Sequence, residues 1–335
     1  MKFLTTSSTM RLMTLSFALI QQTTLSLRIK PLAFLSNHHR ACSLQGQRLF
    51  STAEPAVPEN DAVPLSDDVP LLLAEGLFAV NKPLDWTSNN VVSYIRGILE
   101  RDTKQRGGTI AKLRSKGKRK VRVGHGGTLD PLASGVLVIG VGRGTKELQE
   151  FLKGSKRYTA RGEFGFETAT LDMEGNVTKT APYEHITIAS IEEILPEFTG
   201  TIQQIPPIFS AIKKGGKRLY KEARKGISAE DMEIEPREVT IHALNLIDPD
   251  DKTLPSFDLN MECGGGTYVR SLVRDIAYKL DSVATTTLLM RTKQGPYTLD
   301  DTLDKPDWTP DNIYAAIDKF NAMRENEKEE DEKEE

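Results

Sequence analysis

A glycine-dense loop that runs into an apolar strand is the feature that most constrains this chain. The segment from Gly124 to Gly135 reads GHGGTLDPLASG, and residues 134–141 continue it as an apolar run typical of a buried strand. Glycine allows a backbone to turn tightly and to approach a substrate closely. The chain therefore carries a tight loop that leads directly into the interior of a sheet.

Three interpretations of this loop compete. A phosphate-binding loop would end in Lys followed by Ser or Thr and would open a helix. Here Asp130 and Pro131 end the glycine run and a strand follows, which excludes that interpretation. Asp130 could be an ordinary turn residue before a proline. It could equally be a carboxylate displayed for nucleophilic or acid–base catalysis, and the residue types alone leave these two possibilities open.

The order of the elements predicts an α+β domain. Besides the strand after the loop, apolar patterns predict strands over 76–81, 157–166, 239–247 and 257–263, and helices from Thr87 or Ser88 to Leu99, over 145–153 and over 268–280. Ser190 and Glu193 together have the spacing of a capping box at the start of another helix. Regular βαβ alternation is absent. We therefore expect a mixed, largely antiparallel sheet flanked by helices.

The cysteine content and the apolar stretches exclude two classes of protein. Cys42 and Cys263 lie far apart without a C-x-x-C pairing, so neither a disulfide framework nor a zinc site can be built from them. The longest apolar stretches, such as residues 71–80, fall well short of the roughly 20 residues that a membrane-spanning helix needs. We therefore expect no structural metal and no membrane segment.

The two ends of the chain differ in composition from its middle. Residues 1–53 contain six of the 44 basic residues but none of the 47 acidic ones, which leaves the remainder with a net charge near −9. This bias predicts an organelle transit peptide, for the mitochondrion or, as the alternative, the plastid. Residues 54–71 have the composition of a linker, and 72–300 that of the folded domain. In 301–335 we expect a peripheral helix around 312–323 and a solvated acidic tail.

Further segments accompany the loop in a fixed order and carry a family resemblance. They are KPLDWTS at 82–88, GRGTK at 142–146, KRY at 156–158, IPPIFSAIK at 205–213, GKRLY at 216–220, GTYVR at 266–270 and LMRT at 289–292. Together with residues 124–135 they resemble the TruB type of pseudouridine synthase over about 77–297, essentially the whole folded part. Gly126, where the family usually has Thr or Ser, and Asp85, where Gly is common, depart from the pattern.

The resemblance implies the pseudouridine synthase fold and a set of catalytic residues. Asp130 matches the family's nucleophile, which attacks the uracil ring or the ribose. Tyr158 matches the tyrosine that stacks on the flipped base and takes its C5 proton. Arg270 matches the arginine that holds the aspartate ionised, and Tyr268 a neighbouring tyrosine of the pocket. The family's reaction requires no cofactor and no metal.

The resemblance also implies the residues that contact RNA. His125 matches the histidine that occupies the place of the flipped base. A thumb insertion at 212–237 is rich in positive charge around an aromatic ring, and a second basic insertion lies at 101–122. The expected RNA-binding residues are Lys82, Lys156, Lys213, Lys217, Arg218, Tyr220, Arg224 and His125. A solvated helical face is the alternative for the thumb cluster.

The function that the resemblance implies is isomerisation of the T-loop uridine (position 55) of tRNA to pseudouridine. The expected partner is the T-arm of tRNA, with the protein as a monomer. After Tyr297 about 38 residues remain, too few for the separate C-terminal PUA-type RNA-binding domain that many relatives carry. Two alternatives stay open: a guide-RNA-dependent synthase subunit acting on ribosomal RNA, and a tRNA-binding chaperone without catalysis.

Overall fold

The structure is a computed structural model that describes residues 74–108, 120–227 and 231–334, with side chains described as far as residue 326. The expected transit peptide at 1–53, the linker at 54–71 and residues 109–119 of the basic insertion lie outside these ranges. Within the described ranges, the helices all fall short of the length and apolar character that crossing a membrane requires.

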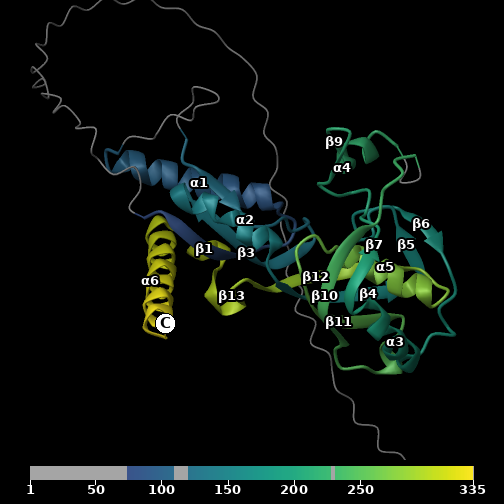
Figure 1. Cartoon of the computed structure of the whole chain (residues 1–335). Helices are drawn as coiled ribbons and strands as arrows, with labels where there is room; N and C mark the ends of the chain where they lie inside the picture. The colour runs from purple at the N-terminus through teal and green to yellow at the C-terminus, as the bar shows by residue number, and fades with distance from the viewer. Residues whose placement is uncertain (1–73, 109–119, 228–230, 335) are drawn as a thin grey trace, which may run out of the picture. The chain divides into compact units, whose positions relative to one another are not determined.

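One large sheet organises the described part of the chain (Figure 1). Along the sheet the strands follow the order β14-β1-β3-β12-β4-β11-β10-β7, with β2 added on β3 and β13 on β12. The strands are β1 (Gly76–Lys82), β2 (Val123–His125), β3 (Ala133–Val141), β4 (Lys156–Phe164), β7 (Gly200–Gln204), β10 (Arg237–Leu246), β11 (Ser256–Cys263), β12 (Ala284–Gln294), β13 (Tyr297–Thr298) and β14 (Thr302–Leu303). Two small hairpins pair β5 (Phe166–Thr168) with β6 (Val177–Thr180) and β8 (Lys213–Lys214) with β9 (Lys217–Arg218).

The sheet is mixed and largely antiparallel, which confirms the predicted fold class. Among its described pairs, β12 runs parallel to β3 and β14 parallel to β1, while the other pairs are antiparallel. The helices are α1 (Ser88–Gln105), α2 (Leu148–Lys153), α3 (Ile188–Ile194), α4 (Leu219–Ala223), α5 (Val269–Lys279) and α6 (Pro310–Glu334). Short 3-10 helices lie at Gly142–Lys146, Leu195–Phe198, Asp251–Thr253, Leu299–Asp301 and Lys305–Asp307.

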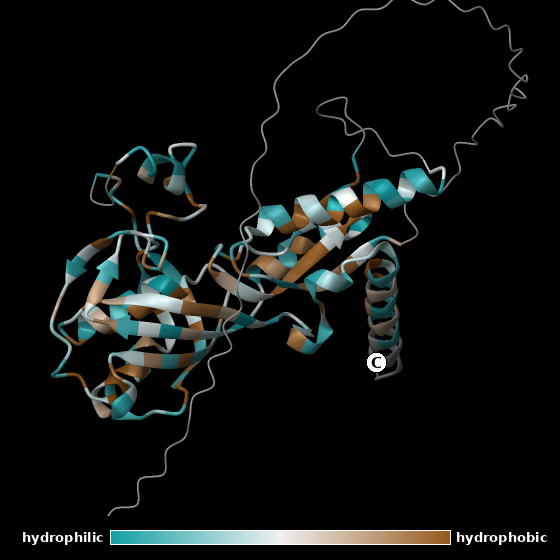
Figure 2. Ribbon diagram, turned by 180° about the vertical axis from the view of Figure 1, so that it is seen from behind, coloured by the Kyte–Doolittle hydropathy of each residue, from teal (hydrophilic) through white to brown (hydrophobic). Residues whose placement is uncertain are grey.

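Local sequence signals set the helix ends, with one correction. Thr87 caps α1 by accepting a hydrogen bond from the amide of Asn90 at 3.0 Å, as predicted. Hydrophobic and hydrophilic residues both occur along α1 (Figure 2), and its Val, Ile and Leu side chains are buried. The predicted capping box at Ser190 and Glu193 is wrong, because Thr187 and Ser190 form the box and the helix begins at Ile188. The box at Thr187 satisfies the backbone amides of the first helical turn, and this turn begins about one turn earlier in the chain than predicted.

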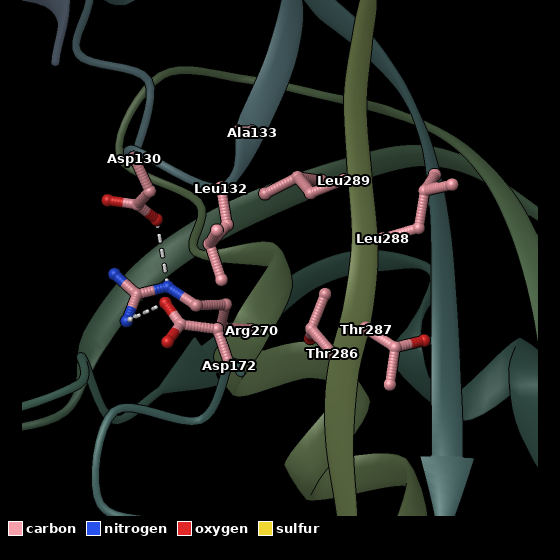
Figure 3. A pocket seen from close by; sticks show the side chains of 9 residues that line it. All are labelled: Asp130, Leu132, Ala133, Asp172, Arg270, Thr286, Thr287, Leu288 and Leu289. Carbon is pink, nitrogen blue, oxygen red and sulfur yellow. Dashed lines mark ion pairs between the residues drawn. The ribbon is translucent and has the colours of Figure 1, made fainter. Parts of the chain in front are cut away.

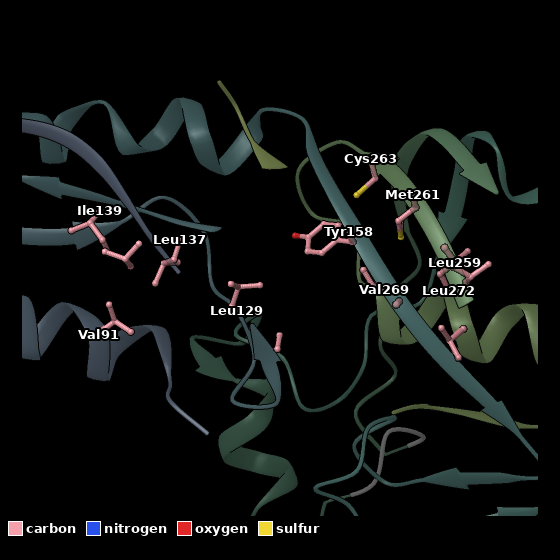
Figure 4. Packing of buried hydrophobic residues seen from close by; sticks show 14 of the residues in the cluster. Val91, Leu129, Leu137, Ile139, Tyr158, Leu259, Met261, Cys263, Val269 and Leu272 are labelled. Carbon is pink, nitrogen blue, oxygen red and sulfur yellow. The ribbon is translucent and has the colours of Figure 1, made fainter. Parts of the chain in front are cut away.

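The core forms where α5 packs against the sheet. Val269 and Leu272 of α5 lie beside Leu259 and Met261 of β11 (Figure 4), and all four are at most 5% exposed. Burial of each such side chain stabilises the fold by roughly 1.5–3 kcal/mol. This packing fixes the first turn of α5, which carries Arg270, against the sheet.

The helix α6 belongs to the folded domain, which corrects the boundary expected at 300 and the description of this helix as peripheral. Ile313 and Ile317, one turn apart, are fully buried in the main core. Phe320, one further turn along, stacks on Tyr297 with ring centroids 4.6 Å apart. These positions form an apolar stripe at helical spacing that covers β1, so the first half of α6 has to fold with the sheet.

Gly135 lies on β3 between β1 and β12 and has a φ of +99°. A Cβ there would lie 2.2 Å from the carbonyl oxygen of Arg291. Gly135→Ala is therefore expected to lower the free energy of unfolding by roughly 2–3 kcal/mol, measured by urea denaturation. Gly200→Ala is the matched control, because Gly200 has a φ of +93° but an open space around its Cβ position. Equal losses in both variants would show that the contact with Arg291 contributes nothing.

Candidate active site

Asp130 stands near the end of the loop between β2 and β3, and its main chain is fixed on both sides. The hydroxyl of Ser88 accepts from the amide of Leu129 at 2.8 Å and donates to its carbonyl at 3.1 Å. The amide of Ala133 donates to the carbonyl of Asp130 at 3.0 Å. The side chain of Asp130 is 33% exposed. The loop therefore holds an accessible carboxylate in a defined position.

Arg270, in the first turn of α5, forms an ion pair with this carboxylate. Its Nε lies 2.8 Å from Oδ2 of Asp130, while the arginine side chain is only 4% exposed (Figure 3). Its remaining nitrogens donate to the carbonyl oxygens of Thr170 and, at 3.2 Å, of Phe209. A buried guanidinium with fixed donors orients a neighbouring carboxylate. The expected pairing of Arg270 with Asp130 is present.

Asp172 is a second carboxylate on the same arginine, and the sequence analysis missed it. Its Oδ2 lies 3.4 Å from Nη1 of Arg270, and its side chain is 8% exposed. Its Oδ1 accepts from the hydroxyl of Thr170 at 2.5 Å and from the amide of Glu174 at 3.0 Å. A bridge to Thr286 joins this turn to β12. In the sequence the only signal is an Asp two residues after a Thr, which is typical of any turn.

A pocket opens at this cluster. Both carboxylates and Arg270 line it together with apolar and hydroxyl side chains of the loop and of β12, namely Leu132, Ala133, Thr286, Thr287, Leu288 and Leu289 (Figure 3). The site thus combines charged groups at one end with an apolar wall. The Asp130 carboxylate and its arginine therefore lie beside an apolar surface.

The two tyrosines of the sequence analysis do not line this pocket, but the charge of Asp130 acts on both phenols. Tyr158 on β4 is 7% exposed, and burial raises the pKa of its phenol, which Asp130 raises further and Arg291 lowers. Tyr268 precedes α5, where the side-chain amide of Gln204 binds its backbone N–H at 2.8 Å and its carbonyl at 3.1 Å. Burial also raises the pKa of Tyr268, with a smaller effect of Asp130. Both phenols are therefore neutral at pH 7 and within the electrostatic reach of Asp130.

Comparison with known proteins decides the family. Residues 114–269 match the family described as TruB family pseudouridylate synthase (N terminal domain). A Mus musculus protein named pseudouridylate synthase TRUB1 is 43% identical over 254 residues, which cover 76% of this chain and 73% of that protein. The tRNA pseudouridine synthase B of Parabacteroides distasonis is 42% identical over 228 residues, which cover 68% of this chain and 89% of that protein. The chain belongs to the TruB family.

Membership in the TruB family makes the chain a pseudouridine synthase, an isomerase, as the sequence analysis expected. Among solved structures, a Cbf5-Nop10-Gar1 complex matches with a TM-score of 0.48 and 24% identity, covering 71% of this chain and 55% of that chain. In the described part of this TruB chain, no group of three or more His, Cys, Asp or Glu side chains could hold a metal ion.

Lys82 does not lie where it could contact RNA, which corrects the sequence-based expectation. Its side chain is fully buried, and its Nζ donates to the carbonyl oxygens of Pro83 at 2.7 Å, Trp86 at 2.5 Å and Pro131 at 3.1 Å. Burial lowers the pKa of Lys82 to about 8. Lys82 therefore ties the segment after β1 to the loop that carries Asp130, as a structural residue of the site.

Lys156 is also buried, so its expected RNA contact is contradicted as well. Its Nζ donates to the carbonyl oxygens of Leu152 at 3.0 Å and Gly154 at 2.5 Å, at the end of α2. Carbonyls at a helix C-terminus favour a cation, yet burial lowers the pKa of Lys156 to about 8. Sequence reasoning cannot separate such a lysine from a surface lysine, because both stand beside aromatic and basic neighbours.

Lys156→Met is expected to change how stability depends on pH. The pKa of Lys156 is about 8 in the folded chain against an ordinary value of 10.5. Between these values the unfolded chain binds the proton that the folded chain has lost, so this lysine makes the free energy of unfolding rise with pH by up to about 1.4 kcal/mol per unit. Methionine removes that rise. Urea denaturation of both proteins between pH 7 and 10 measures the difference.

The control for this prediction is Lys153→Met, which removes an exposed lysine from the same helix end. Its difference from the wild type should stay nearly constant over the same pH window. If the free energy of unfolding of Lys156→Met also differed from the wild type by a constant amount over this pH window, burial would not lower the pKa of Lys156.

The remaining expected RNA contacts lie where a substrate could reach them. Lys213, Lys217 and Arg218 are exposed on the β8–β9 hairpin. The guanidinium of Arg224 lies 5.5 Å from the ring centroid of Tyr220 in the same thumb. The half-buried His125 accepts from the amide of Gly127 at 3.3 Å, and burial lowers its pKa, so it is neutral at pH 7. Their contacts with RNA stay a prediction.

The two departures from the TruB pattern have local explanations. Asp85 adopts a φ of +63°, a left-handed conformation in which glycine is common and Asp is tolerated. Gly126 lies against Phe151, whose Cβ is 2.7 Å from the position that a Cβ of residue 126 would take. A larger residue at 126 would therefore have to displace Phe151. Neither change alters the groups around Asp130.

Proposed function

We propose that this TruB synthase converts the T-loop uridine (position 55) of tRNA to pseudouridine, with Asp130 as its nucleophile. The observation that carries the proposal is the accessible Asp130 carboxylate, 2.8 Å from a buried Arg270, in a chain 42% identical to a tRNA pseudouridine synthase B. A carboxylate fixed at the edge of an apolar pocket is the group that nucleophilic attack on a sugar or a uracil ring requires.

The reaction divides between the groups of the site. Asp130 attacks the ring or the ribose so that the glycosidic bond breaks. The freed base turns and forms a carbon–carbon bond through C5, and Tyr158 takes the C5 proton. The uridine must leave the folded T-loop to reach the pocket, because its glycosidic bond is inaccessible inside the loop. Lys213, Lys217 and Arg218 of the thumb supply positive charge for the RNA backbone in a protein of negative net charge.

Tritium release tests the activity and the position together. A T-arm transcript that carries C5-tritiated uridine is the substrate, and a matched transcript has cytidine at the T-loop position. We expect release from the first transcript only. Equal release from both would overturn the proposed position. Tight binding without release from either would favour the RNA chaperone or the guide-RNA-dependent subunit instead.

We also propose import into the mitochondrion, on the composition of residues 1–53, which combines basic, Ser and Thr residues with a complete lack of acidic ones. The full chain with a C-terminal fluorescent protein is expected to co-localise with a mitochondrial marker, and the same chain without residues 1–53 should not. Fluorescence in plastids would support the alternative address, and an unchanged distribution would contradict both.

A further inference from the structure

Arg291 is a buried guanidinium in the site to which the proposed reaction gives no role. It lies on β12 and is 1% exposed. Its Nε donates to the carbonyl of Val136 on β3 at 2.7 Å, and its Nη2 to the carbonyl of Gly127 at 3.3 Å. No carboxylate of the described residues lies within ion-pair distance of it. Burial of a cation without an anion costs several kcal/mol of folding free energy, so a purely structural role for Arg291 would destabilise the fold.

Tyr158 is the direct cross-strand neighbour of Arg291. The two residues face each other in the register of β12 and β4. The Tyr158 hydroxyl points away from β11 toward the loop of Leu129 (Figure 4). The charged and titratable groups that face this phenol are Arg291 on β12, Cys263 on β11 and Asp130 on the loop. Arg291 is the only cation among them, and its charge lowers the pKa of the phenol.

We propose that Arg291 is a positioning residue that holds the Tyr158 phenol and stabilises its phenolate during removal of the C5 proton. This inference rests on the proposed function. The phenol first gives its proton to solvent, and Arg291 stabilises the phenolate that forms. The phenolate oxygen then takes the C5 proton, the C5–H bond electrons re-form the double bond of the ring, and the tyrosine is again a neutral phenol. The buried guanidinium has an anionic partner only while the base is a phenolate, so it raises the share of enzyme molecules that carry the base.

Burial supports this assignment independently of the register. Burial raises the pKa of Tyr158, and Arg291 opposes that rise. Without the guanidinium the phenolate would form only at higher pH. The ascending limb of the pH profile for product formation should therefore move to higher pH when Arg291 is replaced by a neutral residue.

Gln294 offers a matched control on the same strand. It is fully buried, and its Nε2 donates to the carbonyl of Gly126 at 2.7 Å while its Oε1 accepts from the amide of Val138 at 3.3 Å. It therefore clamps the same loop and the same strand β3 as Arg291. It is uncharged and its cross-strand neighbour is Lys156, so a variant of Gln294 loosens the loop without removing a charge beside the phenol.

The experiment compares single-turnover product formation by the wild type, Arg291→Gln and Gln294→Met on a T-arm transcript. The target uridine carries either protium or deuterium at C5. Arg291→Gln is expected to react about 10-fold to 100-fold more slowly and to show a larger isotope effect than the wild type, because C5 deprotonation becomes rate-limiting. Gln294→Met is expected to react more slowly with an unchanged isotope effect and an unchanged pH profile.

The outcomes separate this inference from the proposed function. Product from the wild type with the same isotope effect and pH profile in both variants would overturn the role of Arg291 alone. Absence of product from the wild type would refute the proposed function itself. Arg291→Lys keeps a cation and serves if Arg291→Gln does not fold. Arg291→Lys should show the wild-type isotope effect even where its rate of product formation falls. A raised isotope effect in Arg291→Lys would contradict the proposal.

Discussion

Asp130→Asn is expected to abolish pseudouridine formation, with a loss of about 10⁴-fold or more in turnover, while the protein still binds tRNA. The amide keeps the shape of the carboxylate and leaves an oxygen toward Arg270, but it cannot act as the nucleophile. Single-turnover product formation and filter binding of a T-arm transcript measure the two effects separately.

Asp85→Asn is the matched control for this substitution. Asp85 has an exposed carboxylate. Its backbone amide donates at 2.9 Å to the carbonyl of Pro131, the residue that directly follows Asp130. Asn tolerates its left-handed backbone, so this variant should keep nearly the wild-type turnover. Turnover near the wild type in Asp130→Asn would show that another group is the nucleophile.

Arg270→Met is expected to lower the free energy of unfolding by roughly 3–5 kcal/mol and to abolish turnover as well. The substitution leaves the buried Asp172 without its cation and removes the donors to the carbonyls of Thr170 and Phe209. The free energy of unfolding follows from urea denaturation, and turnover from the tritium assay.

A second substitution separates stability from catalysis. In the double variant Arg270→Met with Asp172→Asn, the buried carboxylate at position 172 no longer lacks a cation, so part of the lost stability should return. Turnover should not return, because Asp130 still lacks its partner. Recovery of turnover together with stability would mean that Arg270 only supports the fold.

The sequence predicted the parts of the site that lie in long motifs. It did not predict the role of residues whose function depends on whether the side chain is buried. Asp130 and Arg270 belong to segments whose family resemblance predicted that the two side chains pair, and the structure places them in contact. Lys82 and Lys156 were expected to face RNA, because residue type and neighbours say nothing of whether an ammonium points outward or toward backbone carbonyls.

Two further residues of the site escaped the sequence analysis for physical reasons. Asp172 lies in a short turn whose spacing resembles any Asx turn, and only the tertiary fold brings it to Arg270. Arg291 lies within the LMRT motif, but the sequence does not reveal its role, because its contacts come from β3, β4 and the loop. The fold class was easier to predict, since the alternation of apolar residues reports strands and helices directly.

The position of β12 has a consequence for the synthesis of the enzyme. This strand lies between β3 and β4 and joins the two parts of the sheet, although about 140 residues of chain separate it from β3 and about 120 from β4. On a ribosome, β3 and β4 emerge long before the strand that will separate them. The nascent chain therefore cannot complete its sheet, or bring Arg291 to Tyr158, until Gln294 has left the exit tunnel. A chain interrupted before that point would carry the nucleophile without an active site.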